Sequence, residues 1–315
     1  MMSSQSHDAE FDVLVIGTGA SGMATAVTAA SQGLKVLVVE KGALYGGTTA
    51  RSGGWLWVPG THLATEQGIH ETPGAAKAYL KDQGGTHYDE ARVDAFLENG
   101  PKAIEFFTSK TCLQFDMPPV FPDYHAEAPG GTQGGRSMVT RPFDARQLGD
   151  KVKTLAPPVP ELTVFGMMLG SGKELWHFLR AFKSVESFLY VAKRFGLHFL
   201  DVLRHGRGMT LTNGNALAGR LAKAGMDLGI PVCLNSPAQK LIMQGDTVVG
   251  DGCEIGPDTR LVDATVGDGA FVEHTVGRDC EIGADATVGP YAFLPPGSAV
   301  HSGAVTGAFY TAPAD

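Results

Sequence analysis

The chain has 315 residues, 43% of them apolar and 18% charged, which indicates a globular protein with one large or two medium domains. Its formal net charge of −8 argues against a nucleic-acid partner and supplies no polybasic membrane signal. No apolar run reaches the roughly 18 residues that a membrane-spanning helix needs.

The four cysteines are far apart and show no zinc-binding spacing, so we expect no metal site and a reducing, cytoplasmic location. The first ten residues are polar and lack the apolar core of a signal peptide. No H-E-x-x-H, G-x-S-x-G or Walker-type G-K-[ST] motif occurs.

Residues 11–41 predict a strand, a glycine turn, a helix and a second strand. Residues 11–16 form a short apolar run typical of a buried parallel strand. The run ends at a G-x-G-x-x-G motif, Gly17-Thr18-Gly19-Ala20-Ser21-Gly22. Residues 20–32 then carry good helix formers up to Gly33, and the apolar residues 34–39 lead to Glu40.

Each part of this pattern suits a dinucleotide. Gly17 permits the tight turn, Gly19 lets a pyrophosphate approach the backbone, and Gly22 allows close packing of helix and strand. The helix start offers free N–H groups and a positive dipole to phosphates. Glu40, 18 residues after Gly22, can accept hydrogen bonds from a ribose. The alternative is a glycine turn that serves only helix packing.

A second glycine-rich loop follows, with the sequence Tyr45-Gly46-Gly47-Thr48-Thr49-Ala50-Arg51-Ser52-Gly53-Gly54. Its backbone and hydroxyl groups can approach a flat, phosphorylated ligand. A flavin enzyme needs such a loop along the isoalloxazine ring, whereas a nicotinamide enzyme has no particular need for it here. A flexible surface loop is the alternative.

The segments GTGASG, VVEK and GGTTARSGGWLWVPG resemble the flavoprotein family of fumarate reductase flavoprotein subunits and 3-ketosteroid Δ1-dehydrogenases, and WLWVPG is closer to the second branch. The resemblance implies an α/β FAD/NAD(P)-binding (Rossmann-like) domain, FAD as cofactor, and dehydrogenation of an apolar ketone or steroid-like substrate. It also implies cofactor contacts by Gly17, Gly19, Ala20, Ser21, Gly22, Glu40, Lys41, Gly47, Thr48, Thr49, Ser52, Gly53, Gly54 and, on a later strand, Ala238.

Two core helices are predicted next, over residues 73–80 and 91–107, the second one broken at Gly100-Pro101. The segment FPDYH…GGRS…RPFD again resembles the ketosteroid dehydrogenases, in which a tyrosine at the position of Tyr124 faces the steroid. A phenol can donate to a developing enolate or relay a proton. A tyrosine that packs a loop is the equally weighted alternative, and His125 is expected to be structural.

One long helix is predicted over Glu174–Arg204. Its aromatic-rich stripes are expected to pack into the core, and a cover over a sterol-sized substrate is the alternative. A helix over residues 216–228, a strand over 230–234 and a hairpin formed by 238–243 and 247–250 follow. The family's later segments, which carry its other active-site tyrosines, are not found, so the domain over residues 1–250 is predicted to be incomplete, with an exposed sheet edge.

From about residue 246 aliphatic residues recur every six positions within three groups separated by two phase slips, namely Val249, Ile255 and Leu261, then Val266 and Val272, then Val276, Ile282, Val288, Leu294 and Val300. This hexapeptide repeat predicts a short left-handed parallel β-helix over residues 251–315. The segment VGPYAFLPPGS resembles the acetyltransferase domain of the bifunctional UDP-N-acetylglucosamine pyrophosphorylase/glucosamine-1-phosphate acetyltransferase. The nucleotide-gripping arginine of that family falls at Pro295, so acyl transfer is not expected, whereas assembly into a homotrimer is.

Three functions are compatible with these patterns. The first is a FAD oxidoreductase of the steroid-dehydrogenase type. The second is a FAD- or ADP-binding module without turnover, joined to an oligomerising β-helix. The third and least favoured is a sugar-nucleotide acyltransferase.

Overall fold

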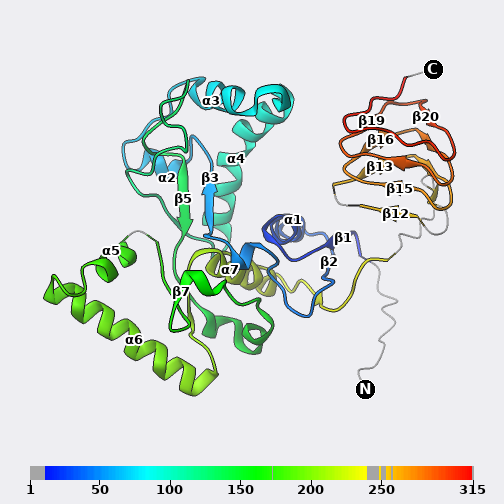
Figure 1. The fold of residues 1–315 in the computed structure, drawn as a ribbon. Helices are drawn as coiled ribbons and strands as arrows, with labels where there is room; N and C mark the ends of the chain where they lie inside the picture. Colours follow the sequence, from blue (N-terminus) through cyan, green and yellow to red (C-terminus); the bar gives the residue numbers. More distant parts are fainter. Residues whose placement is uncertain (1–10, 172, 240–247, 250–252, 257, 314–315) are drawn as a thin grey trace, which may run out of the picture. The chain divides into compact units, whose positions relative to one another are not determined.

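The computed structural model describes residues 11–171, 173–239, 248–249, 253–256 and 258–313 (Figure 1). The chain divides into two compact units, Met1–Ser236 and Pro237–Asp315. The boundary predicted at residue 250 lies outside the described residues and stays a prediction. None of the helices in the described part is both long and apolar enough to cross a membrane.

The first unit contains a three-stranded parallel sheet in the order β1-β2-β10. It consists of β1 (Val13–Ile16), β2 (Val36–Val39) and β10 (Val232–Cys233). Helix α1 (Ala20–Ser31) joins β1 to β2 and packs its buried residues against the sheet. The predicted strand, turn, helix and strand are therefore confirmed, and so is a third strand within residues 230–234.

Helix α7 (Asn213–Asp227) covers the same core from the later part of the chain. Its Leu217, Leu221 and Ala224 belong to one buried cluster with Val27 of α1 and Val38 of β2. The chain then enters β10, where Val232 pairs with Val38. Residues 13–39 and residues 213–233 thus form one packed body around β2.

The first unit also contains a mixed set of short strands and helices. An antiparallel sheet has the order β3-β5-β4, and the pairs β6-β9 and β7-β8 are antiparallel. The bounds are η1 (Thr49–Arg51), β3 (Trp55–Trp57), α2 (His62–Thr65), α3 (Ala75–Gly84), η2 (Gly85–His87), α4 (Glu90–Lys110), β4 (Phe115–Asp116), β5 (Ser137–Thr140), β6 (Phe143–Asp144), η3 (Ala145–Thr154), η4 (Pro160–Leu162), β7 (Thr163–Val164), β8 (Met167–Met168), α5 (Lys173–Leu179), α6 (Val185–His205) and β9 (Thr210–Leu211).

Two helix predictions are wrong. Helix α4 continues through Gly100 and Pro101 instead of breaking there. A side-chain Cβ at Gly100 would lie 2.9 Å from Val58 Cγ1, so the glycine there serves close packing. The helix predicted over Glu174–Arg204 is two helices, because Ser184 caps a new start with a hydrogen bond from the Ser187 N–H.

The hairpin predicted over residues 238–243 and 247–250 falls largely outside the described residues, which omit 240–247 and 250, and it stays a prediction. Within the described part, strand β11 (Val248–Val249) pairs in parallel with β14 (Thr265–Val266) of the second unit.

In the second unit each of the strands β11 to β17 pairs in parallel with the third strand after it, which gives sheets of order β11-β14-β17-β20, β12-β15-β18 and β13-β16-β19. The remaining bounds are β12 (Glu254–Ile255), β13 (Arg260–Val262), β15 (Phe271–Val272), β16 (Val276–Arg278), β17 (Glu281–Ile282), β18 (Thr287–Val288), β19 (Phe293–Leu294) and β20 (Ala299–Val300).

The core of the second unit contains most of the predicted repeat positions, with Val266, Val272, Ile282, Val288, Leu294 and Val300 all buried. The prediction that Val276 occupies an inward repeat position is wrong, because Val276 is exposed and Gly277 takes the inward position in β16. A Cβ at Gly277 would lie 2.9 Å from Leu261 Cδ2, so no larger residue fits there without a shift.

Candidate cofactor site

The turn after β1 has the backbone geometry that its glycines suggest. Gly17 adopts a φ of 98°, which favours glycine over residues with a side chain. A Cβ at Gly22 would lie only 2.2 Å from the Gly17 carbonyl oxygen. Gly19 is the residue that caps the start of α1. The three glycines therefore hold the start of α1 tightly against the end of β1.

Glu40 links the end of β2 to this turn. Its Oε2 accepts hydrogen bonds from the Thr18 N–H at 3.0 Å and from the Thr18 hydroxyl at 2.6 Å. Its Oε1 accepts a hydrogen bond from the Gly42 N–H at 2.9 Å. Burial raises the pKa of Glu40, but these hydrogen bonds and the charge of Lys41 outweigh it and lower the pKa below 4.5. Glu40 is thus held ionised at the carboxyl end of the sheet.

The glycine-rich loop of residues 45–54 packs on the same turn. Thr18 Oγ1 accepts a hydrogen bond from the Gly46 N–H at 3.0 Å, and Thr49 Oγ1 accepts one from the Ala20 N–H at 2.9 Å. A Cβ at Gly47 would lie 3.6 Å from the Gly19 Cα. Residues 29 positions apart in the chain therefore meet at the start of α1.

The start of α7 meets the loop from another direction, a contact that the sequence did not reveal. A Cβ at Gly54 would lie 2.3 Å from the carbonyl carbon of Asn213, and the Gly214 N–H donates to the Ser52 carbonyl at 3.1 Å. The buried Asn215 donates to the Ala50 carbonyl at 3.1 Å. The N-G-N run that begins α7 correctly indicates a helix start, but it does not by itself indicate a contact with residues 52–54.

The start of α1 keeps donors free. In the described part of the chain, the hydrogen bonds use the Ala20 N–H but not the N–H groups of Ser21 and Gly22. No side-chain atom fills the space over Gly17, and only Thr49 Oγ1 lies within 4 Å of a Cβ at Gly19. Open glycine backbone beside free N–H groups at a helix start fits a diphosphate, so these residues fit the predicted dinucleotide.

The other predicted cofactor residues lie around this crevice or further away. Lys41, Thr48 and Ser52 are exposed, and Gly53 is half-buried. Ala238 is exposed and belongs to the second unit. Among the described residues, no hydrogen bond links any of these five positions to the start of α1.

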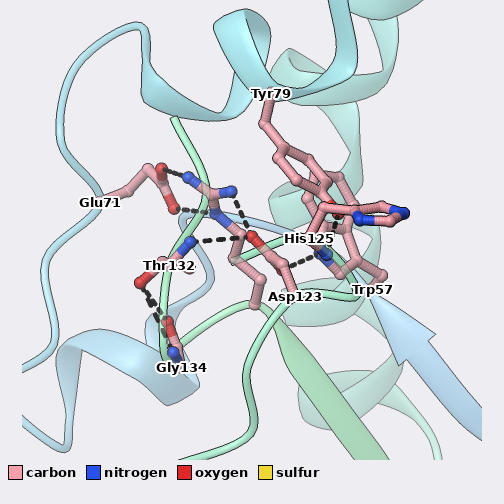
Figure 2. A network of polar contacts seen from close by, with 8 residues as sticks. Trp57, Glu71, Tyr79, Asp123, His125, Thr132 and Gly134 are labelled. Carbon is pink, nitrogen blue, oxygen red and sulfur yellow. Dashed lines mark hydrogen bonds and ion pairs between the residues drawn. The ribbon is translucent and has the colours of Figure 1, made fainter. Parts of the chain in front are cut away.

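Tyr124, the predicted catalytic residue, lies on the surface of this chain with 99% of its side chain exposed. The structure does not bring it to the glycine turn. It follows Asp123, which is buried in a network of polar contacts (Figure 2).

The network fixes the backbone on either side of Tyr124. Asp123 Oδ1 accepts from Trp57 Nε1 at 2.7 Å, and Asp123 Oδ2 accepts from Arg136 Nη1 at 2.7 Å. The Arg136 guanidinium also donates to both oxygens of Glu71. The His125 N–H donates to the Tyr79 hydroxyl at 3.3 Å. The guanidinium thus bridges the carboxylates of Glu71 and Asp123, which are labelled in Figure 2.

Burial lowers the pKa of Arg136, but the paired carboxylates outweigh it and raise the pKa overall. The guanidinium also lies 5.6 Å from the centre of the Trp57 ring, a cation–π distance. Arg136 is therefore a fixed cation that ties β3, β5 and the turn at Asp123 together.

A cavity of about 670 Å³ opens beside the end of the glycine-rich loop. Trp55, which directly follows Gly54, lines it together with Asn213 of α7 and Tyr190 of α6. Burial, followed by the charge of Glu174, raises the pKa of Tyr190. Neither Tyr190 nor Asn213 was predicted as a site residue, because their positions depend on how distant helices pack.

The family model of the FAD binding domain matches residues 12–308 of the chain. This match confirms FAD as the predicted cofactor. The chain is also 40% identical over 256 residues to 4-oxocyclohex-2-ene-1-carboxylate 5-dehydrogenase of Sinomonas cyclohexanicum. This alignment covers 81% of the chain and 43% of that relative.

Among solved structures, the 3-ketosteroid delta1-dehydrogenase from Sterolibacterium denitrificans in complex with 1,4-androstadiene-3,17-dione is 34% identical, with a TM-score of 0.66 over 75% of this chain and 42% of that one. Over 65 residues the chain is also 55% identical to the bifunctional protein GlmU of Mycobacterium marinum, and this alignment covers 21% of the chain and 13% of that relative. The chain spans less than half the length of each of these proteins.

Proposed function

The chain belongs to the FAD binding domain family, and from this membership we propose that it holds FAD at the start of α1, between the turn at Gly17–Gly22 and the loop of residues 45–54. The observation that carries the proposal is the open glycine backbone beside the free N–H groups of Ser21 and Gly22. Glu40 fixes the turn through Thr18 and keeps acceptor capacity for a ribose hydroxyl. Thr48, Ser52, Gly53 and Gly54 are proposed to follow the flavin.

We further propose that the reaction is the removal of a hydride and a proton from adjacent carbons of a cyclic ketone. Both dehydrogenases named above act, by their names, on ring compounds that carry a ketone. Bound FAD supplies the capacity to accept the hydride. The cavity lined by Trp55 is proposed to take the apolar ring.

Tyr124 is proposed to donate a proton to the ketone oxygen as the enolate develops. Two contacts support this role. The buried Asp123 and the backbone bond from His125 to Tyr79 fix the residues on both sides of Tyr124, while its own hydroxyl is left free to meet a ligand at the surface.

A FAD-binding module without turnover is the second candidate, and two observations favour it. The face of β1 opposite α1 is bare, with 47% of Leu14 and 58% of Ile16 exposed. The chain also covers only 43% of the first relative. These two facts support a domain that is incomplete as a catalyst although its cofactor crevice is formed.

For the second unit we propose a short left-handed parallel β-helix that assembles into a homotrimer. Strands β11 to β17 each pair in parallel with the third strand after them, which is what a coil with three faces requires. The likeness to GlmU supports descent from a hexapeptide-repeat domain. Pro295 in the segment VGPYAFLPPGS offers no charge for a nucleotide, so the proposed contribution is assembly and not acyl transfer.

The test is the purified full chain. We expect a yellow protein with about one flavin per chain, and loss of the flavin absorbance when a 3-ketosteroid or 4-oxocyclohex-2-ene-1-carboxylate is added without oxygen. A flavin that stays oxidised with both ketones would favour the module without turnover. A colourless protein that takes up no added FAD would overturn the proposal, and light scattering on the same sample reports whether the chain is trimeric.

A further inference from the structure

Helix α6 (Val185–His205) has its polar and apolar sides reversed. The residues of α6 that are buried are all polar, namely Ser187, His198 and Asp201. Its large apolar residues are mostly exposed, namely Val185, Phe188, Leu189, Leu197, Phe199, Leu200, Val202 and Leu203. A helix on the surface of a globular protein normally buries its apolar side and exposes its polar side.

The polar side of α6 is fully engaged with the body of the first unit. His198 Nε2 lies 3.2 Å from the Phe165 carbonyl oxygen, and Asp201 accepts from the Met209 N–H at 3.1 Å. Ser187 Oγ lies 3.1 Å from His177 Nδ1. These partners fix the rotation of α6, so its outward apolar side cannot turn inward without breaking buried polar contacts.

The outward side is one continuous stripe. At 100° per residue, the exposed Val185, Phe188, Leu189, Phe199, Leu200 and Leu203 fall within about 120° of one another around the helix axis. Leu203 is 83% exposed. Helix α5 (Lys173–Leu179) and the residues after it extend the surface with Leu175, Trp176, Leu179 and Phe182. Figure 1 shows α5 and α6 at the periphery of the first unit.

The charges beside this surface are mostly positive. Between Glu174 and Gly206 the exposed ionic side chains are one carboxylate, Glu186, against the cations Arg180, Lys183, Lys193 and Arg204. Lys193 and Arg204 directly follow Ala192 and Leu203, which places them at the border of the stripe. The Arg180 guanidinium lies 4.4 Å from the centre of the Trp176 ring. This cationic rim stands out in a chain of net charge −8.

We propose that the α5–α6 apolar face docks onto a membrane surface rich in anionic phospholipid, with α6 lying in the plane of the interface. Phe, Leu and Trp side chains on one side of a helix and Lys or Arg at its border are what such an interface takes, and long cationic side chains reach the headgroups from the border. An anionic surface complements the rim.

Two other arrangements fit the same observations less well. A second copy of this chain would bring an identical positive rim to a two-fold contact, where like charges oppose each other. A membrane-spanning arrangement would need a helix more apolar than any in the described residues. The surface orientation buries the apolar stripe and leaves the polar contacts of His198 and Asp201 intact.

The test is flotation of the purified full chain with vesicles of phosphatidylcholine alone and of phosphatidylcholine with phosphatidylglycerol. We expect binding to the anionic vesicles that is about tenfold tighter than to the neutral ones and that weakens as salt is added. Leu189→Gln with Leu203→Gln should weaken binding at least about tenfold. Lys193→Glu with Arg204→Glu should do so without loss of apolar area.

Val305→Gln is the matched control, because Val305 is 76% exposed and belongs to the second unit, and it should leave binding unchanged. The test variants replace exposed side chains, so their unfolding midpoints should equal that of the wild type. This measurement separates lost docking from lost folding. Binding that ignores both double variants, or no binding to anionic vesicles, would overturn the proposal. A wild-type dimer that L189Q/L203Q converts to a monomer would instead assign the face to a second copy. All of these readouts are independent of flavin content.

Discussion

Thr18 and Glu40 are joined by two hydrogen bonds to one carboxylate oxygen, from the Thr18 N–H at 3.0 Å and from its hydroxyl at 2.6 Å. The same hydroxyl oxygen accepts from the Gly46 N–H at 3.0 Å. Glu40 therefore holds both glycine segments of the proposed cofactor crevice, in addition to any direct contact with a ribose.

Glu40→Gln should weaken FAD binding and destabilise the first unit by about 1–2 kcal/mol, because hydrogen bonds to a charged acceptor are replaced by weaker ones. Flavin titration and denaturant unfolding of the full chain measure the two effects. Glu161→Gln is the control, since Glu161 is exposed, and it should change neither quantity. Unchanged flavin affinity in E40Q would argue against Glu40 as an organiser of the crevice.

The contribution of Glu40 should depend on pH in one direction. Its pKa in the folded chain lies below the ordinary 4.5, so the unfolded chain binds more protons as the pH falls past 4.5. The stabilisation is complete above that pH and is lost as the pH falls through the folded-state pKa. The stability difference between wild type and E40Q, measured by unfolding in a pH series, should be constant near neutral pH and shrink below about pH 4.5. A difference that grows in acid would contradict this sign.

Gly22→Ala should destabilise the first unit by about 1–3 kcal/mol and lower FAD affinity, because the new Cβ would lie 2.2 Å from the Gly17 carbonyl oxygen. Gly196→Ala on α6 is the contrast, since a Cβ there meets nothing within 4 Å and alanine favours the helix by up to about 1 kcal/mol. Thermal unfolding and flavin retention check both. Equal behaviour of the two variants would mean that the turn at Gly17 relaxes freely.

The crevice could be predicted from the sequence because its signals are local. The apolar runs that flank the G-x-G-x-x-G motif of Gly17–Gly22 determine the strand, turn and helix over about 30 residues. The contact of Asn213 with Gly54 could not be predicted in the same way, because it joins residues 159 positions apart and depends on how α7 packs.

The orientation of α6 escaped prediction for a related physical reason. Its periodicity in the sequence correctly indicates an amphipathic helix, and an apolar stripe normally faces a core. Here the buried partners of Ser187, His198 and Asp201 turn that stripe outward. A sequence shows which residues share a side of a helix, but the polar partners that decide which side faces inward come from other elements.

Arg136→Gln should destabilise the first unit by about 3–5 kcal/mol, because it leaves the buried Asp123 and the partly buried Glu71 without their shared cation. Arg141→Gln is the control. The Arg141–Asp116 pair is about half exposed on both sides, and surface pairs contribute within about 1 kcal/mol. Tryptophan fluorescence should report the loosened network around Trp57, whose indole donates to Asp123. Similar costs for both variants would show that the network in Figure 2 is not held by Arg136.

Gly277→Ala should loosen the second unit alone. A Cβ at this inward position would lie 2.8 Å from Cys280 Sγ and 2.9 Å from Leu261 Cδ2, two side chains of the same hydrophobic cluster. Overpacking of this kind costs about 1–3 kcal/mol. Hydrogen exchange of the full chain should become faster across residues 258–300 and stay unchanged in α1 and α7, because the two units are separately compact. Gly307→Ala, where a Cβ meets nothing within 4 Å, should leave exchange as in the wild type. Faster exchange in α1 as well would mean that the two units unfold together, and the inward glycine would then support the stability of both.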